Sequence, residues 1–130
     1  MYRPALISGA ALAALAVVLG AFGAHALKGV LPPDQLPIYE TAVRYQFYHC
    51  FALIAIGITY HFTPVRPLRM AASCMLAGIF LFSGSLYAMT LMSISGAHLG
   101  PVGVLTPIGG LCFIIGWVFF IFGIAKNRAL

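Results

Sequence analysis

Residues 104–125 read VLTPIGGLCFIIGWVFFIFGIA, an apolar stretch without a single charged residue. The stretch has about 20 residues, the length that an α-helix needs to cross the hydrocarbon core of a membrane. Three further stretches of similar length and character precede it, at roughly Ala5–Ala26, Thr41–Phe62 and Met70–Ser93. We therefore expect an all-α integral membrane protein, a four-helix bundle, with a single transmembrane domain over residues 1–130. Its helices are expected at about 5–26, 35–62, 68–94 and 103–125.

The composition leaves no room for a separate soluble domain. Hydrophobic residues make up 62% of the chain and charged residues 7%, which is typical of membrane proteins. The apolar stretches are continuous rather than alternating, so a β-barrel is excluded. Cys50, Cys74 and Cys112 each lie inside an expected helix without metal-type spacing, and we interpret them as free thiols in apolar packing sites.

The charged residues indicate the topology of the chain. Four helices place the two termini and the middle link on one side of the membrane. That side holds five basic residues and no acidic ones: Arg3, Arg66, Arg69, Lys126 and Arg128. The other side holds two of each sign: Lys28, Asp34, Glu40 and Arg44. The positive-inside rule then predicts that both termini are cytoplasmic. The net charge of +5 is a topology signal on this interpretation, and we expect no nucleic-acid partner.

The start of the chain resembles a secretory signal peptide in its Arg3, its apolar run and the small residues around His25. The apolar run is longer than the 7–15 residues of a signal-peptide core. We therefore expect it to be a retained first helix.

Polar groups gather in the outer half of the expected bundle, on the side opposite the termini. The second helix carries residues 39–49, YETAVRYQFYH, in which Glu40 and Arg44 stand at i, i+4 and can pair. Polar residues of the other helices fall at the same depth. The candidate polar layer comprises His25, Glu40, Arg44, Tyr45, Gln46, His49, Ser83, Ser85, Tyr87 and Thr106. Because these residues form one layer rather than a track across the membrane, they disfavour a pore or a proton wire.

This layer has more than one interpretation. Its members can join helices, each hydrogen bond contributing roughly 0.6 kcal/mol. They can also form a ligand or lipid-headgroup site, in which Arg44 attracts an anionic group and His49 and Tyr45 complete the pocket. Catalysis by Glu40 and His49 is a third option. Haem ligation by paired histidines is disfavoured because the histidines lie at unequal depths, so we expect no cofactor and no metal. Tyr2, Tyr39 and Tyr60 are expected to anchor the protein at the membrane interfaces.

Four segments carry a family resemblance: 19–28 (LGAFGAHALK), 39–49 (YETAVRYQFYH), 81–87 (LFSGSLY) and 106–110 (TPIGG). They resemble the DUF423 family of small four-helix membrane proteins, which is related to the transmembrane protein 256 group. Cys50 departs from the family pattern, which has Ala after the histidine. The resemblance implies a bacterial inner-membrane protein of four helices and brings no activity with it.

We therefore expect a non-enzymatic plasma-membrane protein that stabilises, assembles or accompanies another membrane component. The links between helices are short, so a partner would bind through helix faces within the lipid bilayer. That partner is either a second copy, giving a homo-oligomer, or another membrane protein. The alternative is a small-molecule or lipid-headgroup binding protein, or a transporter component, that uses Arg44 and His49.

Overall fold

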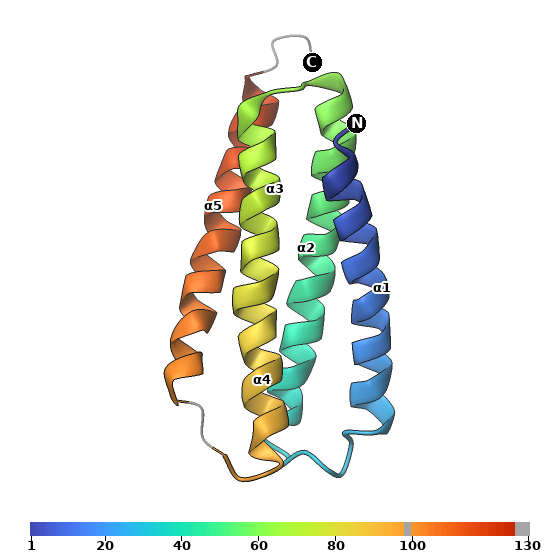
Figure 1. Ribbon diagram of the computed structural model, residues 1–130, viewed down its shortest axis with the longest axis vertical. Coiled ribbons are helices and arrows are strands. Elements are labelled where there is room, and N and C mark those ends of the chain that lie inside the picture. Colours follow the sequence, from blue (N-terminus) through green and yellow to red (C-terminus); the bar gives the residue numbers. More distant parts are fainter. Residues whose placement is uncertain (98–99, 127–130) are drawn as a thin grey trace.

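The computed structural model describes residues 1–97 and 100–126, and helices make up most of them (Figure 1). The first two helices are α1 (Arg3–His25) and α2 (Leu36–Phe62). The third is continuous and consists of α3 (Arg66–Gly78), the π-helical turn η1 (Ile79–Ser83) and α4 (Gly84–Ser93). A 3₁₀ turn, η2 (Gly100–Val104), leads into α5 (Leu105–Ala125). The predicted all-α, four-helix fold is confirmed.

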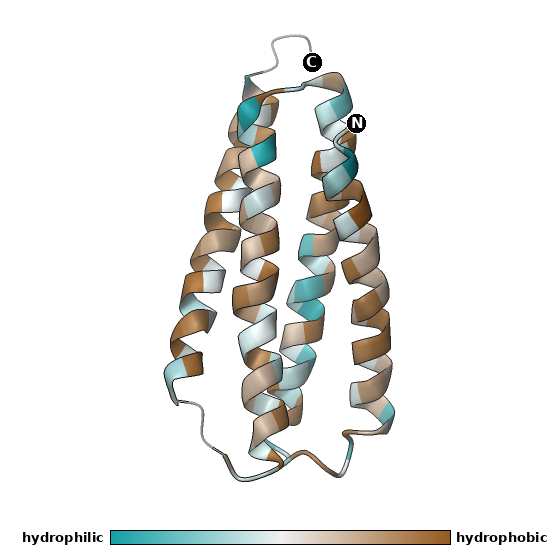
Figure 2. Ribbon diagram, viewed as in Figure 1, coloured by the Kyte–Doolittle hydropathy of each residue, from teal (hydrophilic) through white to brown (hydrophobic). Residues whose placement is uncertain are grey.

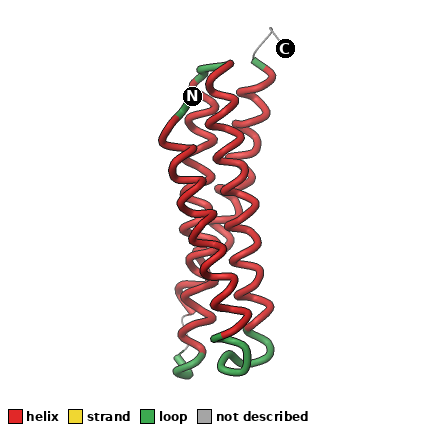
Figure 3. Tube along the Cα trace, turned by 90° about the vertical axis from the view of Figure 1, so that its right-hand side faces the viewer, coloured by secondary structure: helices red, strands yellow, loops and turns green. Residues whose placement is uncertain are grey.

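The helices form two hairpins that lie side by side. α1 packs along α2, whereas α5 packs along α3 and η1. The hairpins meet where α2 lies against α3, η1 and α4, and α2 has only slight contact with α5. Figure 1 shows the resulting order α5, α3–α4, α2, α1 across the molecule, and the view at 90° in Figure 3 is narrower. α1 and α5 are therefore the outer helices, on opposite edges.

One end of the molecule gathers the basic residues. α1 begins and α5 ends at this end, and the link between α2 and α3 lies there too (Figure 1). Arg3, Arg66, Arg69 and Lys126 consequently share this end, as the topology argument predicted. Arg128, the fifth basic residue of that argument, lies outside the described residues. The opposite end carries the α1–α2 link and the connection from α4 to η2.

Three helices of the described chain are long and apolar enough to cross a membrane: Arg3–His25, Arg66–Ser93 and Gly100–Ala125. The helix α2 is not among them, although its 27 residues extend about 40 Å. Its polar residues lower its hydropathy, and Figure 2 shows them in its middle and toward the α1–α2 link. α2 lies between α1 and the third helix, so Gln46 and His49 are buried, whereas Glu40 and Arg44 stay exposed.

The apolar core fills the half of the bundle nearer the termini. Its fully buried members come from α2 and α3 and include Leu53, Ile56, Leu68 and Met75. Cys50 belongs to the same core as a free, buried thiol, in agreement with its predicted packing role. Among the described residues, the opposite half contains a smaller cluster around Leu27, Leu31 and Tyr39, and polar contacts also hold the helices together there.

The α1–α2 link turns where glycine permits it. Gly29 has φ +94°, a left-handed conformation that residues with a side chain rarely adopt. Asp34 precedes α2 but does not cap it. α2 begins at Leu36 without a side-chain cap, and Asp34 Oδ2 instead accepts a hydrogen bond of 3.0 Å from the amide of its neighbour Gln35.

Candidate functional site

Gln46 lies at the centre of the polar layer and connects three helices. Its side chain is buried and belongs to α2. The amide Nε2 donates to the carbonyl oxygen of Leu12 in α1 at 2.8 Å, and Oε1 accepts from the hydroxyl of Tyr87 in α4, also at 2.8 Å. A single glutamine therefore links α2 to its neighbours on both sides.

Tyr39 makes a second connection between α1 and α2. The sequence predicted an exposed anchor at the membrane interface, but Tyr39 is only 1% exposed. Its hydroxyl donates to the carbonyl oxygen of Leu19 at 2.8 Å, and its ring meets the ring of Tyr87 edge-on at 5.2 Å. Gly23 makes this burial possible, because a Cβ there would lie 2.6 Å from the Tyr39 ring. The prediction for Tyr39 was wrong because the space left by a glycine on a different helix decides where the ring goes.

The π-helical turn η1 brings the third helix close to both neighbours. Ser83, fully buried in this turn, donates to the carbonyl oxygen of Ala42 in α2 at 2.8 Å. On the other side, Gly109 of α5 packs against the backbone of Leu81 and Phe82, where a Cβ would collide with the backbone nitrogen of Phe82. π-turns widen a helix locally, and here the widened turn is clamped between α2 and α5.

Ser85 and Thr106 join α4 to α5. Their hydroxyl oxygens lie 2.6 Å apart, and Ser85 also donates to the carbonyl oxygen of Phe82 at 2.9 Å. A serine hydroxyl has one proton, so Thr106 donates to Ser85 in this pair. The helix α5 is thereby fixed at its start, next to the close contact made by Gly109.

His49 connects α2 to α5 further along. Its Nδ1 lies 2.7 Å from the carbonyl oxygen of Tyr45, one turn earlier, and its Nε2 accepts from the indole N–H of Trp117 at 3.3 Å. The imidazole also stacks on the ring of Phe113, with a centroid distance of 3.4 Å and an interplanar angle of 8°. All hydrogen-bonding capacity of this imidazole is used inside the protein.

Polar residues in the other half of the bundle behave differently. Ser8, Thr59 and Ser73 bond to carbonyl oxygens four residues earlier in their own helices, so they connect nothing. Within the described residues, every buried side-chain nitrogen or oxygen has a hydrogen-bond partner. The side-chain hydrogen bonds described above that link one helix to the next therefore lie in the outer-half layer.

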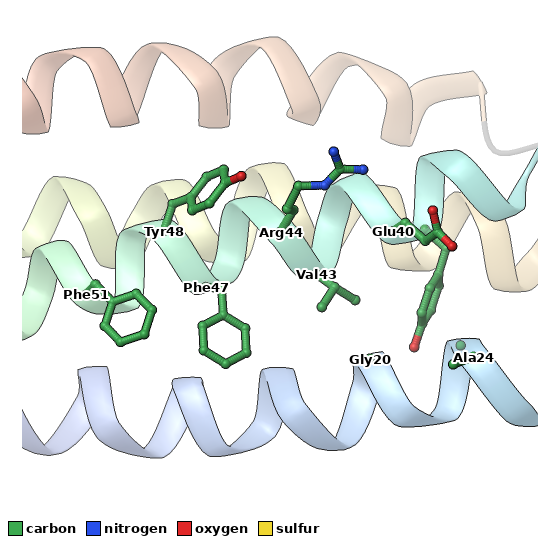
Figure 4. A pocket seen from close by; sticks show the side chains of 10 residues that line it. Gly20, Ala24, Glu40, Val43, Arg44, Phe47, Tyr48 and Phe51 are labelled. Atoms are coloured by element: carbon green, nitrogen blue, oxygen red, sulfur yellow. The ribbon is translucent and has the colours of Figure 1, made fainter.

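Four members of the predicted layer remain on the surface. His25, Glu40, Arg44 and Tyr45 are exposed, and the His25 ring lies 3.0 Å from the carbonyl oxygen of Ala21 in its own helix. The spacing suggested that Glu40 and Arg44 pair, but in the described part of the chain no ion pair or hydrogen bond joins them. Both extend outward from α2 (Figure 4).

The surface of the bundle has two grooves near the layer. One, of about 380 Å³, lies between α1 and α2 and includes Glu40 and Arg44 in its lining. The other, of about 570 Å³, lies between α2 and α5 and includes Tyr45, His49 and Trp117. Arg44 and His49 thus line different grooves. The predicted pocket in which Arg44, Tyr45 and His49 act on one ligand is therefore wrong, because Arg44 lies in a different groove from the other two residues.

The histidines do not converge. His25 and His49 lie on different helices, one exposed and one buried, and His61 lies at the opposite end of α2, where its Nδ1 is 3.4 Å from the N-terminal amine. His98, which entered the haem argument, lies outside the described residues. Among the residues that the structure places, no three His, Cys, Asp or Glu side chains form a group that could hold a metal ion.

Comparison with known proteins agrees with this architecture. The family model described as "Protein of unknown function (DUF423)" matches residues 19–110, a stretch that includes every residue of the predicted layer. The chain belongs to the DUF423 family. It is 42% identical over 121 residues to a UPF0382 membrane protein of Staphylococcus aureus, covering 93% of this chain and 94% of the relative.

Two other relatives extend the comparison. The UPF0382 membrane protein YwdK of Bacillus subtilis is 39% identical over 93% of this chain and 95% of its own length. A UPF0382 membrane protein of Haemophilus influenzae is 36% identical over 88% of this chain and 87% of its own length. No solved structure matches this DUF423 chain. Its relatives are bacterial membrane proteins, and the apolar helices described above agree with that assignment.

Proposed function

We propose that this DUF423 protein is a non-enzymatic component of the bacterial plasma membrane that assembles with a partner through its helix faces. The observation that carries the proposal is the use of the polar layer. Its members form hydrogen bonds to neighbouring helices, as Gln46, His49 and Ser83 do. In this proposal the layer holds the four helices together, and the exposed helix faces bind the partner.

The outer face of α1 suits a partner helix best. Exposed alanines occupy this face, at positions 10, 11, 14 and 21, together with the exposed Ile7 and Val18. Small residues let helix backbones approach closely, which drives association where no water is present. The outer face of α5 instead presents large side chains such as Ile114, Ile121 and Phe122, which keep a neighbouring backbone at a distance and suit lipid. The partner helix comes from a second copy or from another membrane protein.

The proposal includes the orientation of the chain in the membrane. Arg3, Arg66, Arg69 and Lys126 share one end of the described bundle, and basic residues in short links are retained in the cytoplasm. Both termini then face the cytoplasm, and the polar layer lies in the outer half of the membrane.

The test is purification of the tagged protein in mild detergent, with co-purifying proteins identified by mass spectrometry. We expect a stoichiometric partner or a homo-oligomer. Ala14→Phe should remove it, because the added ring blocks close approach on α1, whereas Ile114→Phe on α5 should retain it. Both positions are exposed, so neither variant should lower the melting temperature. Isolation of wild type only as a monomer, or retention of the partner by Ala14→Phe, would contradict the proposal.

A further inference from the structure

The groove between α1 and α2 has a distinct chemistry along its length (Figure 4). On the α1 side its lining is limited to the small residues Gly20, Gly23 and Ala24. The space that they leave is faced by Val43 and Phe47 of α2, whose side chains point toward α1. Small residues on one wall and an aromatic residue on the other give a slot that opens to the membrane.

Three polar side chains follow one another along the rim of this groove. Glu40, Arg44 and Tyr48 are spaced by four residues, so each lies about 6 Å further along α2 than the one before. All three are exposed, and within the described part of the chain none of them makes a hydrogen bond or an ion pair. In Figure 4 the guanidinium of Arg44 is directed toward the Glu40 end of the groove, and the hydroxyl of Tyr48 is directed toward Arg44.

The groove continues toward the middle of the membrane as an apolar surface. Phe51 lies there beyond Phe47 and is 57% exposed. Glu40 lies nearest to the beginning of α2 and hence nearest to the membrane interface. Starting from the interface, the groove therefore presents a carboxylate, a guanidinium, a phenol and then aromatic rings. Charged side chains at this depth reach toward the headgroups.

We propose that this groove binds a phospholipid with an ethanolamine headgroup. The order of groups in such a lipid, from the interface inward, is ammonium, phosphate, ester and acyl chain, which matches the groove. Arg44 binds the phosphate, for which a planar guanidinium is well suited. Glu40 accepts hydrogen bonds from the ammonium, Tyr48 donates to an ester carbonyl, and one acyl chain lies along Phe47 and Phe51.

The charges of the rim distinguish this lipid from other phospholipids. A choline headgroup has the same net charge but no N–H group to donate to Glu40. A glycerol headgroup has no ammonium, so the Glu40 carboxylate has no counter-charge and repels the phosphate that Arg44 binds. The unpaired state of Glu40 and Arg44 fits a lipid that carries both complementary charges.

The purified full-length protein can be incubated with an equimolar mixture of ethanolamine, choline and glycerol phospholipids of identical acyl chains, and bound lipids measured by native mass spectrometry. We expect wild type to retain the ethanolamine lipid about tenfold over the others, the value of one charge-assisted hydrogen bond. Glu40→Gln should abolish this preference. Arg44→Gln should weaken the binding of all three lipids, again about tenfold. Lys28→Gln and Asp34→Asn make the same charge changes at the same end outside the groove and should have no effect.

A second pair of variants tests the acyl chain. Phe51→Ala should weaken the binding of all three lipids without changing the headgroup preference. Phe80→Ala, at an exposed position on the third helix, should leave binding unchanged. Equal retention of the three lipids by wild type, an unchanged preference in Glu40→Gln, or undiminished binding by Phe51→Ala would each overturn the proposal.

Discussion

The indole N–H of Trp117 donates to Nε2 of His49 across 3.3 Å, connecting α5 to α2. An indole nitrogen only donates, so the Nε2 that faces it carries no proton. The proton of the neutral ring is then on Nδ1, which donates to the carbonyl oxygen of Tyr45 at 2.7 Å. One tautomer satisfies both contacts, and it joins two helices that otherwise have only slight contact.

Replacing Trp117 by Phe should keep the aromatic surface and remove the hydrogen bond to His49. We expect a loss of about 0.6 kcal/mol in the free energy of unfolding, the typical value for such a bond between membrane helices. The ¹⁵N spectrum of wild type at neutral pH should show one protonated and one bare nitrogen on His49. Two protonated nitrogens would disprove the assigned contact, since a charged imidazole has no acceptor for the indole.

Two adjacent glycines of α5 should respond oppositely to alanine. A Cβ at Gly109 collides with the backbone of η1, so Gly109→Ala should destabilise the bundle by about 1–3 kcal/mol, the usual cost of overpacking. A Cβ at Gly110 lies 3.8 Å from the Phe82 ring, an ordinary contact. Gly110→Ala should therefore be neutral or stabilising by up to about 1 kcal/mol, because alanine favours a helix over glycine. Thermal unfolding in detergent measures the stability of both variants. Equal melting temperatures would refute the close packing of Gly109 against η1.

Removing the charge of Arg44 or Glu40 should leave the stability of the bundle unchanged. Both side chains are exposed and unpaired among the described residues. Substitutions at such surface positions usually change the free energy of unfolding by less than about 0.5 kcal/mol. Arg44→Ala and Glu40→Ala should therefore melt with wild type in detergent. A loss of more than about 1 kcal/mol in either variant would show that the two residues support the fold.

Two cysteine variants that leave the charge of the chain unchanged test its orientation in the membrane. Pro33 lies in the α1–α2 link and Pro64 in the α2–α3 link, and both are exposed. In intact cells a membrane-impermeant thiol reagent should label Pro33→Cys and should label Pro64→Cys only after lysis. Wild type, whose cysteines all lie within helices, is the background control. The reverse pattern would place the termini outside the cytoplasm.

Much of the architecture follows from the sequence because long apolar runs have few alternatives in a membrane. The runs predicted four helices, and the structure has them. Residues such as Gln46 and Ser83 were identified by their cost in an apolar environment. Their partners were not, because Leu12 and Ala42 contribute backbone carbonyl oxygens, which every residue type possesses.

The predictions that failed concern the contacts of individual side chains rather than the positions of the helices. The spacing of Glu40 and Arg44 permits a pair but does not require one, since exposed charges find other partners. Tyr39 fits an interface position by its chemistry, yet the space beside Gly23 allows it to be buried. Trp117 gave no signal as a partner of His49 because the register between α2 and α5 depends on η1 and on Gly109. Such relationships require the packed structure.

The central claim is that the polar layer joins helices, and the bond between Gln46 and Tyr87 tests it most directly. A double-mutant cycle of Gln46→Leu and Tyr87→Phe isolates this contact from the bond of Gln46 to Leu12. Unfolding free energies in detergent should show each single variant destabilised and a coupling energy of about 0.6 kcal/mol between them. Additive losses with no coupling, or wild-type stability in both single variants, would contradict the account.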